Sequence, residues 1–261
     1  TVLEDLYKHF IESKESTFFI AVRDQLRQAS EDMREHARFL KRLEEQKAAI
    51  KASQRASDAA STMSAGTVMS AIQGTEGNED GAGGDDGDGD EGNSDAGKRI
   101  FKEAAAIRDV LRVVTLLCKH EGMQDLIRGQ SGNDKSVDLM SEVVQYVVAL
   151  EHMLPTAISM RNVRPLVVAT IALHTIDAMV MGPNLEACMH AMHTNLFDLM
   201  NRLFIDRKYE GSQSMFNYKV KMRTAMMAII RTVVRGMPLE DKDLIQSFVN
   251  SGFSFETYLM Q

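Results

Sequence analysis

Residues 163–181 read VRPLVVATIALHTIDAMVM, and this nearly all-apolar stretch decides the fold class. Its uncharged part, from Pro165 to Ile176, has 12 residues. A helix that crosses a membrane needs about 20, so the stretch predicts a central, fully buried helix of a globular domain. Gly182, Pro183 and Asn184 follow it. Gly suits a helix C-cap and Asn an N-cap, so a second helix is expected to begin at this turn.

Apolar residues recur at helical spacing on both sides of this stretch, and no segment shows the period of two that strands require. The groups are Ile107, Leu111, Val114, Cys118; Val137, Met140, Val144, Val147; Leu185, Met189, Met192, Leu196, Leu199, Leu203; and Met222, Met226, Ile229, Val233. Two short closing helices are expected over 239–249 and 253–260. Residues 98–261 are therefore predicted to form an all-α domain of six to eight helices, either a bundle or an armadillo-like solenoid segment.

Residues 1–55 are predicted to be a long amphipathic helical segment. Its apolar stripe, with steps of three and four, contains Phe19, Val22, Leu26, Ala29, Met33, His36, Leu40 and Leu43. One helical face holds all of these residues, and charged residues occupy the other faces. Such a stripe docks on its own molecule, docks on a partner surface or pairs as a coiled coil. Docking within the same molecule is the favoured interpretation.

Residues 56–97 are Ser/Ala-rich and then Gly/Asp-rich, and they are predicted to be a disordered linker. Residues 76–95 contain nine acidic residues and no basic residue, while the whole chain has a formal net charge of −7. The rest of the chain is therefore close to neutral. It shows no basic stripe of the kind that nucleic-acid binding requires, so no nucleic-acid partner is predicted.

The two cysteines, Cys118 and Cys188, are too few for a disulfide framework and are interpreted as buried thiols of a reducing compartment. No segment is long and apolar enough for a membrane span, and no signal peptide is recognisable. Because the chain begins with Thr1, we expect it to be a piece of a longer protein or a processed product.

Three segments suggest ligand binding and fail on detail. Residues 129–136 read GQSGNDKS, but a phosphate loop needs Gly where Asp134 precedes Lys135, so this segment is interpreted as a polar turn between helices. Asp86, Asp88 and Asp90 fit a calcium loop, but Glu91 and Gly97 stand where Gly and Glu are needed. The third is a group of possible metal ligands without a familiar zinc spacing, interpreted as structural residues: Cys188, His190, His193 and His174. No catalytic elbow is present, so neither enzymatic activity nor a cofactor is predicted.

Several short sequence motifs resemble motifs of the intracellular calcium-release channels, that is, of the inositol trisphosphate receptors and the ryanodine receptors. Residues 112–121 read RVVTLLCKHE and residues 124–130 read QDLIRGQ. The resemblance continues at residues 162–163, 181–184 and 221–236, at the N-terminal motifs SKESTFF (13–19) and RDQL (23–26), and at the terminal YLMQ (258–261). In order and spacing these motifs resemble the RIH-associated domain and its upstream helix, and they are closer to the inositol trisphosphate receptors.

This resemblance implies a cytosolic helical module of a large channel in an endoplasmic reticulum-like membrane, which relays ligand signals to the pore. Its implied partners are the other domains and subunits of a homotetramer. The family's two calcium-binding glutamates fall at Ala178, beside Asp177, and at Arg235, so the resemblance implies that this calcium site is not retained. The alternative interpretation is a stand-alone helical adaptor or scaffold protein, suggested by the stripe and the acidic segment.

Overall fold

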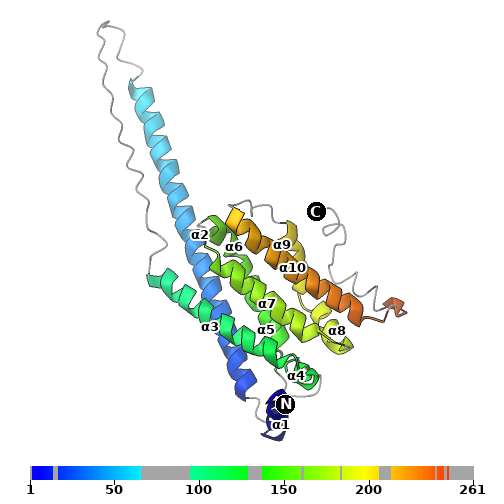
Figure 1. Ribbon diagram of the computed structural model, residues 1–261. Coiled ribbons are helices and arrows are strands. Elements are labelled where there is room, and N and C mark those ends of the chain that lie inside the picture. Colours follow the sequence, from blue (N-terminus) through cyan, green and yellow to red (C-terminus); the bar gives the residue numbers. More distant parts are fainter. Residues whose placement is uncertain are drawn as a thin grey trace. The chain divides into compact units, whose positions relative to one another are not determined.

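The computed structural model describes residues 2–13, 17–65, 95–128, 137–159, 162–182, 184–205, 213–238, 240–243 and 246, and this part of the chain contains helices and no strand. Its ten named helices are α1 (Val2–Ser13), α2 (Thr17–Ala65), α3 (Asp95–Leu117), α4 (Glu121–Leu126), α5 (Leu139–Glu151), α6 (Leu154–Ser159), α7 (Arg164–Val180), α8 (Leu185–His193), α9 (Leu196–Ile205) and α10 (Gln213–Gly236) (Figure 1). The predicted all-α class is confirmed, whereas the choice between bundle and solenoid remains a prediction.

The chain divides into two compact units. The first comprises Thr1–Arg34 with Asp95–Gln261, and the second comprises Glu35–Ser94. Helix α2 supplies residues to both units. It continues to Ala65, ten residues past the boundary expected at residue 55, and α3 begins at Asp95, inside the segment expected to be a linker. Residues 66–94 lie outside the described part, so disorder in that segment remains a prediction.

Helix α7 forms the centre of the first unit and packs against α3, α5 and α10 (Figure 1). Most of its side chains are buried, including Leu166, Leu173 and Ile176. The prediction of a fully buried helix is nevertheless wrong, because Arg164 and His174 are exposed. Three packed neighbours do not enclose the whole circumference of a helix, and polar or charged residues occupy the open side. None of the described helices is long and apolar enough to cross a membrane.

The N-terminal stripe docks within its own unit, as the favoured interpretation expected. Its members are buried as far as Met33, with Leu26 fully inaccessible to solvent. Along the edge of this apolar contact, Arg27 Nε donates to Glu142 Oε1 at 2.6 Å and Arg34 donates to Gln145 Oε1 at 3.0 Å, so α2 is also hydrogen-bonded to α5. His36 is half-buried, and the side chains of Leu40 and Leu43 lie outside the described set.

The downstream apolar groups also form helix cores, and their central members are buried. The described part of 95–236 contains eight helices, of which α4 and α6 have only six residues each. The prediction of six to eight helices covered residues 98–261, so the total number remains a prediction. Residues 129–136 and most of 239–261 lie outside the described part. The interpretation of GQSGNDKS as a turn and the two closing helices are therefore untested.

Candidate functional site

The turn between α7 and α8 is built by residues with matching conformational preferences. Gly182 has a φ of 102°, a left-handed conformation that glycine adopts at low cost. Asn184 then caps α8, because its side-chain oxygen accepts a hydrogen bond of 3.0 Å from the Ala187 amide. The N-cap predicted at Asn184 is confirmed, whereas the C-cap residue of α7 is Met181 and Gly182 follows it in the turn. The turn fixes where the last carbonyls of α7 point.

Gln124 of α4 binds those carbonyls. Its side-chain amide nitrogen donates to the carbonyl oxygens of Cys118, Ala178 and Met181, at 2.9, 3.1 and 2.8 Å. The last carbonyls of a helix have no partner within the helix, so one amide satisfies groups at the ends of both α3 and α7. Gln124 is only 6% exposed, and these hydrogen bonds are shielded from water. We call Gln124, its three acceptors and Gly182 the Gln124 junction.

A charged network lies beside the Gln124 junction and connects α4 to the start of α8. Asn184 Nδ2 donates to Asp125 Oδ1 at 3.0 Å. Arg128 Nε donates to the same carboxylate at 3.2 Å, and its other end forms an ion pair with Glu186. The Arg128 side chain is 17% exposed, so this guanidinium is held partly out of solvent between two acidic groups.

Polar bonds also connect α7 to both of its long neighbours. On the α3 side, the hydroxyls of Thr115 and Thr175 lie 2.9 Å apart. On the α10 side, the Thr232 hydroxyl donates to Asp177 Oδ1 at 2.7 Å. Thr175 is fully buried. These directional bonds fix the register of α7 against α3 and α10, which apolar packing alone specifies less strictly.

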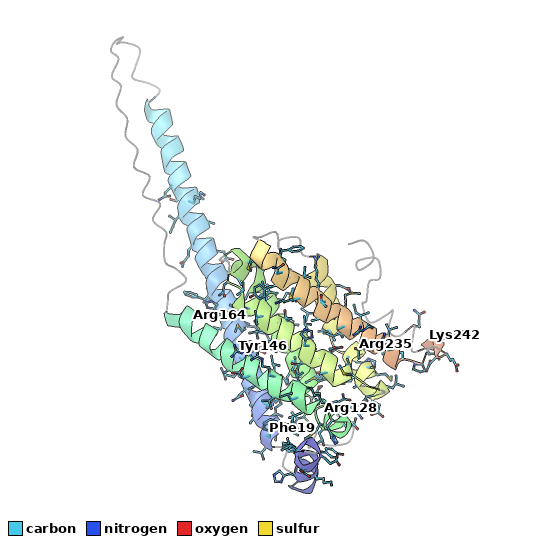
Figure 2. The ribbon with its side chains drawn as sticks, viewed as in Figure 1. Phe19, Arg128, Tyr146, Arg164, Arg235 and Lys242 are labelled. Carbon is cyan, nitrogen blue, oxygen red and sulfur yellow. The ribbon has the colours of Figure 1, made fainter. Side chains whose placement is uncertain are left out.

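The end of α10 meets the Gln124 junction. A Cβ atom placed on Gly236 would lie 2.8 Å from Cys188 Sγ and 3.9 Å from the Gly182 carbonyl oxygen, so only glycine fits this approach without a shift. The two positions where the resemblance places the family's calcium ligands therefore come from helices that end in one region. Ala178 is buried and its carbonyl accepts from Gln124, whereas Arg235 is exposed at the end of α10 (Figure 2).

Of the three residues singled out for calcium, only Asp177 offers a carboxylate. One of its oxygens already accepts the hydrogen bond from Thr232, and Ala178 and Arg235 contribute no anionic oxygen. In the described part of the chain, no three His, Cys, Asp or Glu side chains are grouped closely enough to hold a metal ion. Loss of the family's calcium site at these positions remains a prediction.

Cys188 and the three histidines considered as possible metal ligands do not converge. Cys188 is buried, its thiol is directed at the Val180 carbonyl, and burial raises its pKa to about 11. Burial raises the pKa of the other thiol, Cys118, to about 12, so neither is a reactive thiolate at neutral pH. His190 faces a different helix, where it pairs with Asp138 at 2.9 Å, while His174 and His193 are exposed.

Asp138 is an N-cap that the sequence analysis missed. It accepts from the backbone amide of Ser141 at 3.0 Å and from the Ser141 hydroxyl at 2.6 Å, and it pairs with His190. Burial by itself raises the pKa of Asp138, but the hydrogen bonds with His190 and Ser141 outweigh burial and lower it below its ordinary value. The sequence signal for this N-cap is an Asp that stands directly before an apolar helical segment.

A second missed contact holds α1 against the start of α4. His120 Nε2 lies 2.9 Å from Glu4 Oε2, and the rings of Tyr7 and His120 stack with centroids 4.5 Å apart. The hydrogen bond with His120 lowers the pKa of Glu4. Gly122 makes room for the Tyr7 ring, because a Cβ there would lie 2.4 Å from a ring carbon. Nothing in the spacing of these residues indicated that α1 packs here.

Comparison with known proteins assigns a family to this region. Residues 101–204 match the family described as RyR and IP3R Homology associated. The matched residues include most of α3, all of α4 to α8, and α9 as far as residue 204. The resemblance drawn from the sequence motifs is therefore confirmed for these residues. No curated protein and no solved structure matches the chain.

Proposed function

Because residues 101–204 match the family described as RyR and IP3R Homology associated, we propose that this chain is a cytosolic helical module of a divergent inositol trisphosphate receptor-like calcium-release channel. The family match carries the proposal. The module relays conformational signals to the pore, and its partners are the other domains and subunits of a homotetramer in an endoplasmic reticulum-like membrane. We assign it no catalytic role.

The bonding pattern of α7 supports a mechanical role. A relay has to move as one body, and α7 is tied to α3 through Thr175, to α4 through Gln124 and to α10 through Asp177. Packed helices with fixed register shift together rather than deforming continuously. A displacement that enters at one helix of the first unit is therefore delivered to the others.

The entry point that we propose is the docked part of α2. Arg27 and Arg34 bind Glu142 and Gln145 on α5, and α5 packs directly on α7. A pull on residues 17–34 therefore reaches α7 through α5 and reaches the end of α10 at the Gln124 junction. This path is a proposal that coupling measurements have to test, since spatial continuity alone does not establish coupling.

The first test is the size and location of the native protein, with an antibody raised against residues 35–55. The channel proposal expects a very large membrane-bound species that detergent releases as a tetramer. A small species that stays in the supernatant after the membranes are pelleted would contradict it and favour the adaptor alternative.

The second test addresses the relay in the full-length channel reconstituted in a bilayer. Gln124→Ala is expected to shift the ligand dependence of opening, because it frees the ends of α3 and α7. Gln28→Ala, at an exposed position of α2, is the matched control and should leave gating unchanged. Equal gating of the Gln124→Ala and Gln28→Ala channels would exclude the proposed route through the Gln124 junction.

A further inference from the structure

The outer face of α10 combines exposed apolar side chains with cations and contains no acidic residue. Phe216, Val220 and Met227 are 53%, 44% and 46% exposed. Their spacing of four and seven places them on one face of the helix, and Arg231 continues the same line. Helix α10 has five basic and no acidic residues over Gln213–Gly236. We call Phe216, Val220, Met227 and Arg231 the α10 outer face.

The position of α10 in the fold explains why this face is open. Helices α3, α7 and α10 lie side by side, and α10 is at one end of the row (Figure 1). Its buried residues, such as Met222, Ile229 and Val233, are directed toward the core. The α10 outer face points away from that buried side, at a point where the described part of the chain supplies no further helix.

Arg231 and Arg235 of α10 contrast with cations elsewhere in the first unit. Arg27, Arg128 and Arg202 each bind a carboxylate of another helix. On α10, Lys221 lies over the Tyr218 ring, 5.4 Å from its centroid. Arg231 and Arg235 are exposed and form no ion pair with the described residues. Positive charge is therefore left uncompensated beside an apolar stripe, and this combination favours a partner that is both acidic and apolar.

The two longest segments outside the described part do not combine both properties on one helical face. In residues 66–94 the apolar Val68, Met69 and Ile72 all precede the first of eight acidic residues, Glu76, and residues 247–261 are rich in apolar side chains but contain one acidic residue, Glu256. An anionic membrane is disfavoured because it would extend past the end of α10 to the exposed acids Glu240, Asp241 and Asp243, whereas a partner helix that ends beside Arg235 need not reach them.

We propose that the α10 outer face is a docking site for an acidic amphipathic helix of a protein partner. The partner helix lays its apolar stripe over Phe216, Val220 and Met227 and places Asp or Glu beside Arg231 and Arg235. Because the opposite side of α10 is fixed in the core, the partner contacts one face and does not surround the helix. This inference rests on the exposed residues of α10 and not on the proposed channel function.

The test uses the full chain and a synthetic, fluorescently labelled helical peptide of about 20 residues, with Leu on one face and Glu on both flanks. We expect binding that weakens as salt is raised from about 50 to about 300 mM. Met227→Asp should reduce affinity at least about tenfold. The matched control, Leu116→Asp at a 53% exposed apolar position of α3, should leave affinity unchanged.

Reversing the charges on both partners distinguishes a lost contact from misfolding of a variant. Arg231→Glu should weaken binding of the Glu-flanked peptide and strengthen binding of the same peptide with Lys in place of every Glu. Three results would overturn the proposal: no binding of the Glu-flanked peptide up to millimolar concentration, equally tight binding of a peptide with the sequence of residues 66–94, and Met227-dependent binding to phosphatidylserine-containing vesicles without peptide binding.

Discussion

The Gln124 junction and the contact between α2 and α5 hold the first unit together by different means. At the junction, one buried amide satisfies three carbonyls at the ends of two helices. At the α2–α5 contact, the buried residues are apolar, and the polar bonds of Arg27 and Arg34 lie at its edge. The difference teaches that the helix ends are positioned by direction-dependent bonds, whereas α2 is held mainly by area removed from water.

The largest loss of stability should come from removing a buried apolar side chain from the α2–α5 contact. Leu26→Ala is expected to lower the free energy of unfolding by about 2–5 kcal/mol, because Leu26 is fully buried and a cavity replaces it. Ile50→Ala, at a 59% exposed position of the same helix, is the matched control. Denaturant unfolding followed by circular dichroism measures both. Equal losses for the two variants would contradict apolar docking of α2.

Removing the central amide of the Gln124 junction should have the next largest effect. Gln124→Leu keeps the volume but leaves three carbonyls without their donor, so we expect a loss of about 1–3 kcal/mol. The control is Gln28→Leu, since Gln28 is exposed and bonds only along its own helix. Faster hydrogen exchange at the end of α7 in Gln124→Leu alone would locate the effect, and an unchanged exchange rate there would count against it.

At Tyr146 we expect a substitution that raises the stability of the protein. Its ring is fully buried in α5, its hydroxyl has no hydrogen-bond partner among the described residues, and burial raises its pKa. Tyr146→Phe removes an unsatisfied polar atom without a change of shape, so the free energy of unfolding should rise by about 1 kcal/mol. Tyr218→Phe, at a partly exposed position, should change little. Destabilisation by Tyr146→Phe would indicate a partner for the hydroxyl.

The contribution of Asp138 to the stability of the fold should depend on pH. Because its pKa is lower in the folded state, its charge stabilises the fold above the ordinary pKa of Asp, near 4, and this contribution is lost as the pH falls through the folded-state value. Asn still caps a helix but carries no charge. Asp138→Asn should therefore cost up to about 1 kcal/mol at pH 7 and less at pH 3. A loss that is independent of pH would contradict a role for the charge.

The sequence predicted what depends on local pattern. The stripe from Phe19 to Met33, the Gly182 turn and the Asn184 cap all follow from spacing or from one residue's conformational preference. It did not predict the contacts of Gln124 with Ala178 or of Arg27 with Glu142, which join residues 54 and 115 positions apart. A glutamine reads as an ordinary polar residue until the fold places two helix ends beside it. The basic residues of α10 were missed for a different reason, because the near-neutral charge of the chain outside residues 76–95 hides a local excess of positive charge.

The smallest effect, from Arg27→Ala, sharpens the comparison most, because Arg27 follows Leu26 directly on α2. Its side chain is 54% exposed, so water competes for the bond to Glu142 and salt screens it. We expect Arg27→Ala to cost less than about 1 kcal/mol and less still in high salt. The double variant with Glu142→Ala should add little to the single one, and unfolding measurements on both complete a double-mutant cycle. If Arg27→Ala instead cost as much as Leu26→Ala, α2 would be held by its polar edge, and the contrast with the Gln124 junction would disappear.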